Sequence, residues 1–271
     1  MRCLLPFVAV CFFAFPAHAD WPPKVGTDWT KPANWPNDGG YAQCKVKDKD
    51  GTCTEVSGGD WNLWSWTPAN YAAFPNFRQV EVKMGVGMHA DRAWEKTIGD
   101  RRVLIAVHDS GIKWDHDDLV NKHYLNKKEL PAPEKACQTK EFDAKDPYDT
   151  NGDGIFNMAD WVKEGPKERP KTPCDSRLKD LNKNGLIDPG DLIRTFSDGK
   201  DGDSNGYVDD ISGWDFFRDD NNAYDDTRFG HGTGEARDSA AEGNNGRGSL
   251  GVCPECSILN VRVADSFVAD I

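Results

Sequence analysis

Two short apolar runs stand out from a mostly polar chain. Residues 103–107 (VLIAV) lead through His108 into Asp109, and a Ser-Gly turn follows. Residues 257–265 (SILNVRVAD) have a similar apolar pattern. Short continuous apolar runs that end at turn residues are typical of buried parallel strands. The pattern therefore predicts two such strands, with Asp109 at the carboxyl end of the first.

Other segments have helical spacing. Residues 90–99 (ADRAWEKTIG) predict a short amphipathic helix that ends at Gly99, and the small residues of 231–241 suit a closely packed helix. Strands separated by helices predict an α/β fold, with a parallel sheet flanked by helices. In such sheets, reactive side chains gather at the carboxyl ends of the strands.

The first nineteen residues have the three parts of a secretory signal peptide. Arg2 precedes an apolar run over residues 3–16, and Ala17-His18-Ala19 forms a small-residue cleavage site before Asp20. The run is too short to span a membrane. We therefore expect cleavage near Ala19–Asp20 and a protein secreted to the periplasm or the extracellular space.

Residues 20–89 are rich in tryptophan, proline and glycine and show little helical periodicity. We expect an irregular extension whose tryptophans pack as a core, with an aromatic carbohydrate-binding face as the alternative. The predicted organisation is a signal peptide, this N-terminal extension, and an α/β domain that carries an acidic insertion. The bounds are 1–19, 20–89, 90–271 and, for the insertion, about 143–197.

Charge limits the partners. The formal net charge is −12, from 45 acidic and 33 basic side chains. Binding to nucleic acid or to an anionic membrane requires clustered lysine and arginine, so neither partner is expected. The sequence leaves the oligomeric state open.

Six cysteines remain after the signal peptide, an even number that predicts disulfides in an oxidising compartment. Proximity favours Cys44–Cys53 and Cys253–Cys256, which leaves Cys137–Cys174, although the sequence does not fix the pairing. The run CPEC also fits a redox or zinc C-x-x-C, but zinc is disfavoured because the chain lacks a second such pair.

Two acidic segments fit the template of a calcium-binding loop. Each has oxygen-bearing side chains at positions 1, 3, 5, 9 and 12 and a glycine at position 6, where the loop must turn sharply. The glycines are Gly154 and Gly185. The predicted ligands are Asp149, Asn151, Asp153, Asn157 and Asp160 in the first loop, and Asp180, Asn182, Asn184, Asp188 and Asp191 in the second.

A third segment fits the template in part. It offers Asp201, Asp203, Asn205 and Asp209, but Ser212 stands at position 12. The two complete loops end in aspartate instead of the longer glutamate, which favours structural binding at extracellular calcium levels. The alternative for all three segments is a set of solvated Asx turns.

The sequence around Asp109 and His231 resembles the subtilisin-like serine peptidases (subtilases). VLIAVHDSGIKWDHDDL is similar to their aspartate motif, and GHGTGEA with the segment up to NVRV is similar to their histidine motif. The resemblance covers about residues 90–125 and 198–271, and implies a subtilisin-like sheet. It implies that Asp109 orients a general base, His231, which activates a serine that attacks a peptide carbonyl.

The chain departs from the family pattern in two ways. The histidine motif usually continues Gly-Thr-His-Val-Ala, whereas Gly234, Glu235 and Ala236 follow Thr233 here. The Gly-Thr-Ser-Met-Ala motif of the nucleophile and the oxyanion asparagine are absent from the 271 residues, as is half of the expected sheet. We therefore expect an N-terminal part of the enzyme that is inactive alone. The alternatives are a dockerin-like calcium-binding interaction module, because the loops resemble EF-hand and dockerin loops, and a subtilase pseudo-enzyme.

Overall fold

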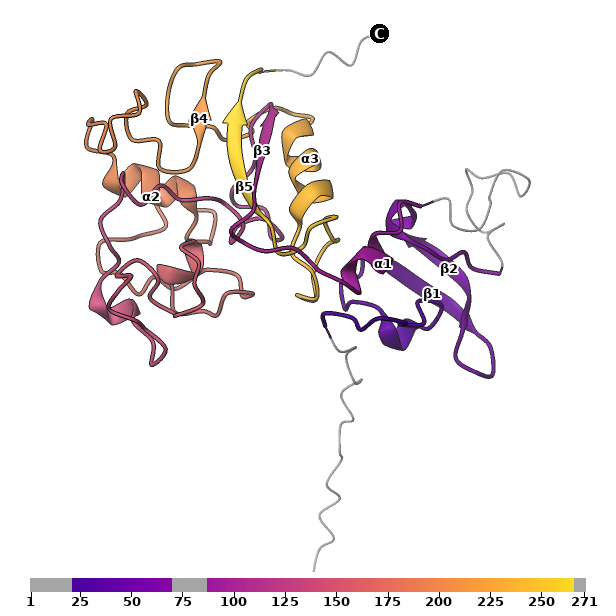
Figure 1. Cartoon of the computed structure of the whole chain (residues 1–271). Helices are drawn as coiled ribbons and strands as arrows, with labels where there is room; N and C mark the ends of the chain where they lie inside the picture. Colours follow the sequence, from indigo (N-terminus) through magenta and orange to yellow (C-terminus); the bar gives the residue numbers. More distant parts are fainter. Residues whose placement is uncertain (1–20, 70–86, 266–271) are drawn as a thin grey trace, which may run out of the picture.

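The computed structural model describes residues 21–69 and 87–265 and shows two lobes of unequal size (Figure 1). The smaller lobe contains β1 and β2, with α1 beside them, and the larger contains the other strands and helices. The strands and helices are β1 (Ala42–Lys47), β2 (Cys53–Gly59), α1 (Ala90–Trp94), β3 (Leu104–Asp109), α2 (Pro189–Phe196), β4 (Trp214–Asp215), α3 (His231–Ala240) and β5 (Ser257–Arg262). No helix of these two ranges is long and apolar enough to cross a membrane.

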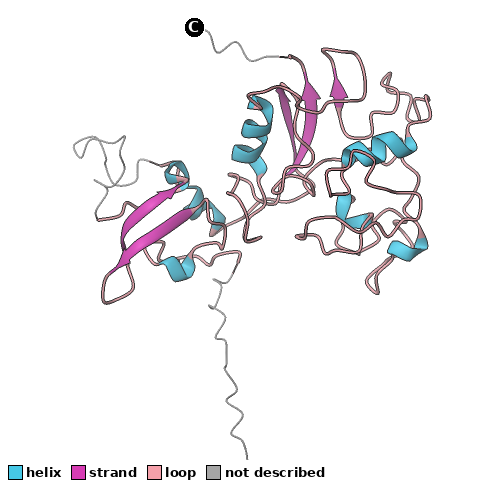
Figure 2. Ribbon diagram, turned by 180° about the vertical axis from the view of Figure 1, so that it is seen from behind, coloured by secondary structure: helices cyan, strands magenta, loops and turns pink. Residues whose placement is uncertain are grey.

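The larger lobe is built on a parallel sheet with the strand order β3-β5-β4, visible from both sides in Figures 1 and 2. Strand β5 lies in the centre, and its register with β3 runs from Leu104 opposite Ser257 to Asp109 opposite Arg262. The predicted parallel α/β arrangement is therefore present, and Asp109 lies at the carboxyl edge of the sheet.

Helix α3 covers one face of this sheet. Its small side chains Ala236 and Ala240 are fully buried and pack with Val107 of β3 and Ile258 of β5. The helix predicted over residues 231–241 is thus found over His231–Ala240, with its first residue at the end of the sheet where Asp109 lies.

Two local expectations need correction. Residues 103–107 were expected to be buried, yet the side chains of Val103 and Leu104 are 52% and 41% exposed. The reason is that α3 covers only the face of β3 that carries Ile105 and Val107, so Leu104 lies on the uncovered face, and Val103 precedes the strand. The helix expected over 90–99 ends at Trp94, because the chain then turns: the oxygen of Ile98 accepts the N–H of Glu255, and Gly99 has a φ of 103°.

Most tryptophans of the extension form a core, as packing predicts, whereas Trp61 is 41% exposed. Five aromatic side chains are at most 7% exposed and pack on one another and on the β1–β2 hairpin; these are Trp29, Trp35, Tyr41, Trp64 and Trp66. The indole N–H groups of Trp35 and Trp64 donate to the backbone oxygens of Trp29 and Tyr41. The buried rings are therefore unavailable for stacking on a sugar.

The smaller lobe contacts the loop that follows α3. The backbone N–H of Gly40 donates to the oxygen of Gly248 at 2.7 Å, and the carboxylate of Asp38 accepts the N–H groups of Asn244 and Asn245. This loop follows the C-terminal end of α3, whereas His231 begins the helix. The extension therefore contacts the domain at the end of α3 that is remote from His231.

The described residues contain the disulfides Cys44–Cys53 and Cys253–Cys256, which proximity favours, and Cys137–Cys174, the pair that remains. Pairing within C-x-x-C leaves no free thiol there for zinc. The signal-peptide cysteines, like the whole predicted signal peptide, lie outside the described residues.

A buried histidine makes the larger lobe sensitive to acid. His123 is 1% exposed, and neither ring nitrogen has a hydrogen-bond partner. Burial, with a smaller contribution from His116, lowers the pKa of His123 to about 3 from 6.5. Between these two pH values the unfolded chain binds a proton that the folded chain excludes, so stability falls as the pH drops from 6.5 toward 3.

Replacing His123 with leucine is therefore expected to flatten the acid limb of the stability curve. The linkage contributes about 3–5 kcal/mol by pH 3. Urea unfolding of the wild type and of His123→Leu at pH 7, 5.5 and 4 would measure the difference in the slope of stability against pH. Equal slopes for the two proteins would contradict the assignment.

Candidate active site and metal-binding loops

Asp109 and His231, which are 122 residues apart in the sequence, lie in contact at the carboxyl edge of the sheet. The Oδ2 atom of Asp109 is 2.7 Å from Nδ1 of His231. The other carboxylate oxygen accepts the backbone N–H of Ser110, also at 2.7 Å. The side chains of Asp109 and His231 are 18% and 23% exposed, so the pair is partly shielded from solvent.

Glycine allows the helix and the strand to approach closely enough for this contact. A Cβ atom on Gly232 would lie 2.3 Å from the oxygen of Gly111 and 2.9 Å from Cβ of Asp109. Gly230 precedes the helix in the left-handed region, with φ of 71°, which costs a residue with a side chain about 1 kcal/mol or more. The close approach and the positive φ therefore explain why glycine stands on both sides of His231.

Hydrogen bonds behind the pair fix the start of α3. The hydroxyl of Ser110 accepts the N–H of Gly232, and the hydroxyl of Thr233 donates to the buried carboxylate of Asp225 at 2.7 Å. The same Thr233 oxygen accepts the N–H of Lys113. These contacts hold the first turn of α3 against the loop after β3, and with it the ring of His231.

A cavity of about 410 Å³ adjoins the pair. The ring of Phe229 stacks on that of His231, with centroids 6.2 Å apart, and Phe229 itself is 75% exposed. The lining residues are Arg218, Asp226, Thr227, Arg228, Phe229, His231 and Asp265. An oriented histidine beside an open cavity can accept a proton from a nucleophile that approaches Nε2.

The comparison with protein families agrees with this geometry. The sequence model of the subtilase family (Peptidase_S8) matches residues 100–269, more than half of the chain. The chain belongs to the subtilase family. At the level of the family it is therefore a serine peptidase-like hydrolase whose substrates are proteins. No curated protein matches the chain.

Two of the serines that follow His231 in this subtilase have hydroxyl groups that donate hydrogen bonds to other residues. The hydroxyl of Ser249 donates to Asp60, and that of Ser257 donates to the backbone oxygen of Arg101 at 2.7 Å. Ser266 lies outside the described residues. Neither Ser249 nor Ser257 is thus arranged as a nucleophile.

The two complete acidic loops of the subtilase have the same closure. In each, the aspartate at position 12 accepts the backbone N–H groups of positions 2 and 9. Asp160 accepts from Thr150 and Asn157, and Asp191 accepts from Leu181 and Asp188. Two segments with the template spacing therefore adopt one loop form.

The predicted ligands converge in the second loop. The side-chain amides of Asn182 and Asn184 lie 3.0 and 2.6 Å from Oδ2 of Asp188, which brings positions 3, 5 and 9 together. Both oxygens of Asp180, at position 1, accept backbone N–H groups of the loop. These contacts are hydrogen bonds from the amide nitrogens of Asn182 and Asn184, whose oxygens accept backbone N–H groups. They bring together side chains of the kinds that bind a hard cation such as Ca²⁺.

In the first loop, positions 1, 3 and 5 gather while position 9 turns aside. Asp149 accepts the N–H groups of Gly152 and Gly154, and Asn151 accepts that of Asp153. Burial, and less strongly the charge of Asp149, raises the pKa of Asp153. The Oδ1 atom of Asn157 caps the 3₁₀ turn Met158–Asp160 by accepting the N–H of Ala159, as Asp188 caps α2 in the second loop. Unlike Oδ2 of Asp188, however, the remaining polar atom of Asn157 has no hydrogen-bond partner at positions 3 and 5. The fit to calcium is thus looser here than in the second loop.

The third segment has a different ligand set from the one predicted. Carboxylate oxygens of Glu129, Asp201 and Asp203 all lie within 4.8 Å of one another, and Asn205 donates to Asp210. Asp209 does not join them, because its two oxygens accept the N–H groups of residues 198 and 199. Asp209 therefore stays a predicted ligand that lies outside this cluster of carboxylates. Glu129 was missed because it lies far away in the sequence and outside any motif.

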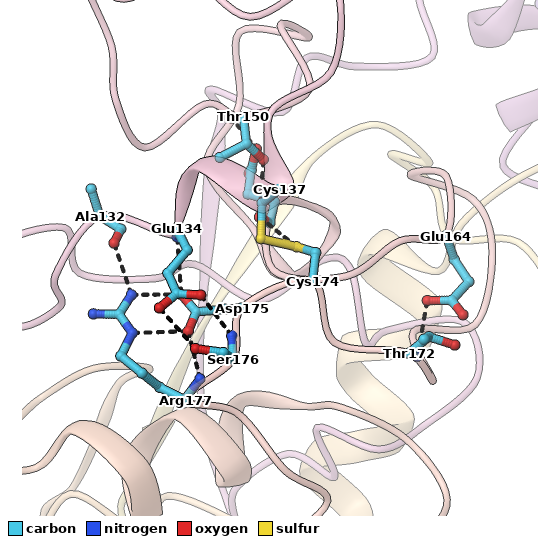
Figure 3. The surroundings of a disulfide bond; sticks show 11 residues. Ala132, Glu134, Cys137, Thr150, Glu164, Thr172, Cys174, Asp175, Ser176 and Arg177 are labelled. Atoms are coloured by element: carbon cyan, nitrogen blue, oxygen red, sulfur yellow. Dashed lines mark hydrogen bonds and ion pairs between the residues drawn. A yellow bond between two sulfur atoms is a disulfide. The ribbon is translucent and has the colours of Figure 1, made fainter.

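The disulfide Cys137–Cys174 joins the segment before the first loop to the segment before the second (Figure 3). On the Cys174 side, Arg177 donates to the buried carboxylate of Asp175, and Glu134 accepts from Ser176. These contacts lie just before Asp180, where the second loop begins. The disulfide and the bond between Glu134 and Ser176 therefore link the two segments that lead into the loops.

Proposed function

We propose that this chain supplies the aspartate and histidine of a secreted, calcium-stabilised subtilisin-like serine endopeptidase. The observation that carries the proposal is the 2.7 Å contact between Asp109 and Nδ1 of His231 at the carboxyl edge of the sheet. In this role Asp109 fixes the ring with its proton on Nδ1, which leaves Nε2 as the base. The family match and the adjoining cavity support it.

The serine would come from outside these 271 residues. Its hydroxyl would donate its proton to Nε2 of His231 as its oxygen attacks the peptide carbonyl. His231 would then return that proton to the leaving amine. The family's serine motif is absent from the sequence, and Ser249 and Ser257 have other partners. On this proposal the 271 residues alone do not hydrolyse peptides.

A fluorophosphonate probe, which reacts covalently with activated serines, tests whether the nucleophilic serine lies outside these 271 residues. The 271-residue chain is expected to remain unlabelled, and the product of a reading frame that continues past codon 271 is expected to be labelled on its added part. Loss of that label in His231→Ala would support the role of His231. Labelling of the 271-residue chain itself would contradict the proposal.

Calcium would be held by the insertion and would act on stability. The residues that fit best are those of the second loop, Asp180, Asn182, Asn184 and Asp188, with Asp191 closing the loop. Burial raises the pKa of Asp191 to about 6 and that of Asp160 to about 7, which shows how costly these charges are without a cation. A bound dication would offset this cost. It would hold the loops together and take no part in the proton transfers.

Secretion is supported by the segment at residues 1–19 and by the three disulfides, which form and persist in oxidising compartments. The same compartments supply calcium at the level that aspartate-closed loops require. We therefore propose export followed by calcium-dependent folding of the insertion.

A further inference from the structure

A second carboxylate lies on the other side of the His231 ring. The Oε1 atom of Glu235 is 3.6 Å from Nε2, the nitrogen opposite the one that contacts Asp109. His231 therefore stands between two acidic side chains, one on the strand β3 and one on its own helix α3. The family's histidine motif has valine at the place of Glu235, so this second carboxylate is a feature of this chain.

The backbone alone brings Glu235 to this place. Side chains four residues apart on a helix are neighbours, with Cβ atoms about 5–6 Å apart. His231 is the first residue of α3, and Glu235 lies one turn later. The Glu235 side chain is 55% exposed, so it reaches Nε2 without displacing a packed group.

Other charged groups near the ring also interact with His231. The N-terminus of α3 disfavours a positive charge on His231, because the helix dipole is positive there. Lys113 lies near Gly230, where its Nζ atom is 3.9 Å from a Cβ built on that glycine. The remaining charged groups near the ring are Asp109 of β3, Asp225 behind the first turn, and Arg218, Asp226, Arg228 and Asp265 of the cavity.

We propose that Glu235 is a positioning residue that holds the Nε2 side of the His231 ring. The inference deepens the peptidase function proposed above and rests on it for its catalytic meaning. A carboxylate at Nε2 accepts a hydrogen bond from a proton on that nitrogen, whereas a general base must present a lone pair there. Glu235 thus competes with the serine hydroxyl for Nε2.

The 271-residue chain is sufficient for the test, because the test follows the ring of His231 and needs no serine. Ring-nitrogen and ring-proton NMR signals of His231 would be recorded at one fixed pH and low salt in the wild type and in Glu235→Gln, which keeps the shape and removes the charge. The Nε2 signal of the variant is expected to move away from that of the wild type, whereas the Nδ1 signal, which the contact with Asp109 sets, stays in place. The difference should shrink as salt is added.

Two further variants complete the design. Glu168→Gln removes an exposed carboxylate in the insertion and is expected to leave the Nε2 signal of His231 unchanged. Glu235→Asp keeps the charge on a shorter side chain and is expected to restore at least half of the change in that signal, which also serves if Glu235→Gln does not fold. Coincident Nε2 signals of the wild type and both Glu235 variants would overturn the proposal. That result would leave the peptidase proposal standing, since that proposal is tested by labelling and cleavage.

Discussion

Replacing Asp109 with asparagine is expected to lower the kcat of peptide hydrolysis by about 10⁴-fold in the serine-containing protein. The amide keeps the shape of the side chain, but it can present N–H to Nδ1 of His231. The ring would then hold its proton on Nε2, where the base must have a lone pair. Steady-state kinetics on a chromogenic peptide would measure the loss, with KM expected to change little because the substrate does not bind through Asp109.

Asp117→Asn provides the matched control for this variant. Asp117 follows β3 by a few residues and has a 45% exposed side chain that pairs with Arg169 at 2.9 Å. Its replacement is expected to leave kcat within about twofold of the wild type, because surface ion pairs contribute little. A kcat for Asp109→Asn close to that of Asp117→Asn would mean that the 2.7 Å contact has no catalytic role.

Removing calcium is expected to lower the thermal unfolding midpoint of the 271-residue chain by about 10 °C. Extracellular loops of this kind bind with dissociation constants of about 10⁻⁴–10⁻³ M. At about 10 mM calcium, each loop then contributes about 1.4–2.7 kcal/mol to the free energy of unfolding. Two loops together account for the expected shift in a domain of this size. Differential scanning calorimetry with calcium and with a chelator would measure it.

Single substitutions assign this effect to the loops. Asp180→Ala is expected to remove the contribution of the second loop and Asp149→Ala that of the first, with the larger loss for Asp180→Ala because its loop gathers more ligands. The double variant should no longer respond to calcium. If calcium leaves the midpoint of the wild type unchanged, the loops are Asx turns without a metal role.

The sequence predicted the sheet and the helix that hold the proposed catalytic pair, because both elements have strong local signals. The apolar run before Asp109 predicts a strand, and the small residues after His231 predict a helix packed on it. Contact between the two residues could not be derived from spacing across 122 positions. It came from the resemblance of the two motifs to subtilases, and the structure then provided the distance.

Elements that depend on tertiary contacts were predicted less well. The exposure of Leu104 depends on which face of the sheet α3 covers, which an apolar run does not reveal. The helix after His89 is short because the chain turns at Gly99 and the oxygen of Ile98 accepts the N–H of Glu255. In such places, contacts with residues that are distant in the sequence determine the structure more strongly than local propensity does.

The same reason explains the errors in the metal sites. A template identifies ligands that follow one another along a loop, and it located both complete loops. It has no means of finding Glu129, which joins Asp201 and Asp203 from a separate segment. It also assigned Asp209 by position, although that carboxylate is occupied by the backbone of residues 198 and 199. Glu235 was visible as a departure from the motif, but its contact with Nε2 required the helix geometry.

The most direct test of the central claim is a comparison of two histidine variants in a peptide-cleavage assay. The assay uses the protein made from a reading frame that continues past codon 271. His231→Ala is expected to abolish cleavage, whereas His108→Ala, next to Asp109 on the same strand, is expected to retain most of it. Cleavage by His231→Ala at the rate of the wild type would contradict the account, and so would a wild-type protein that cleaves no peptide.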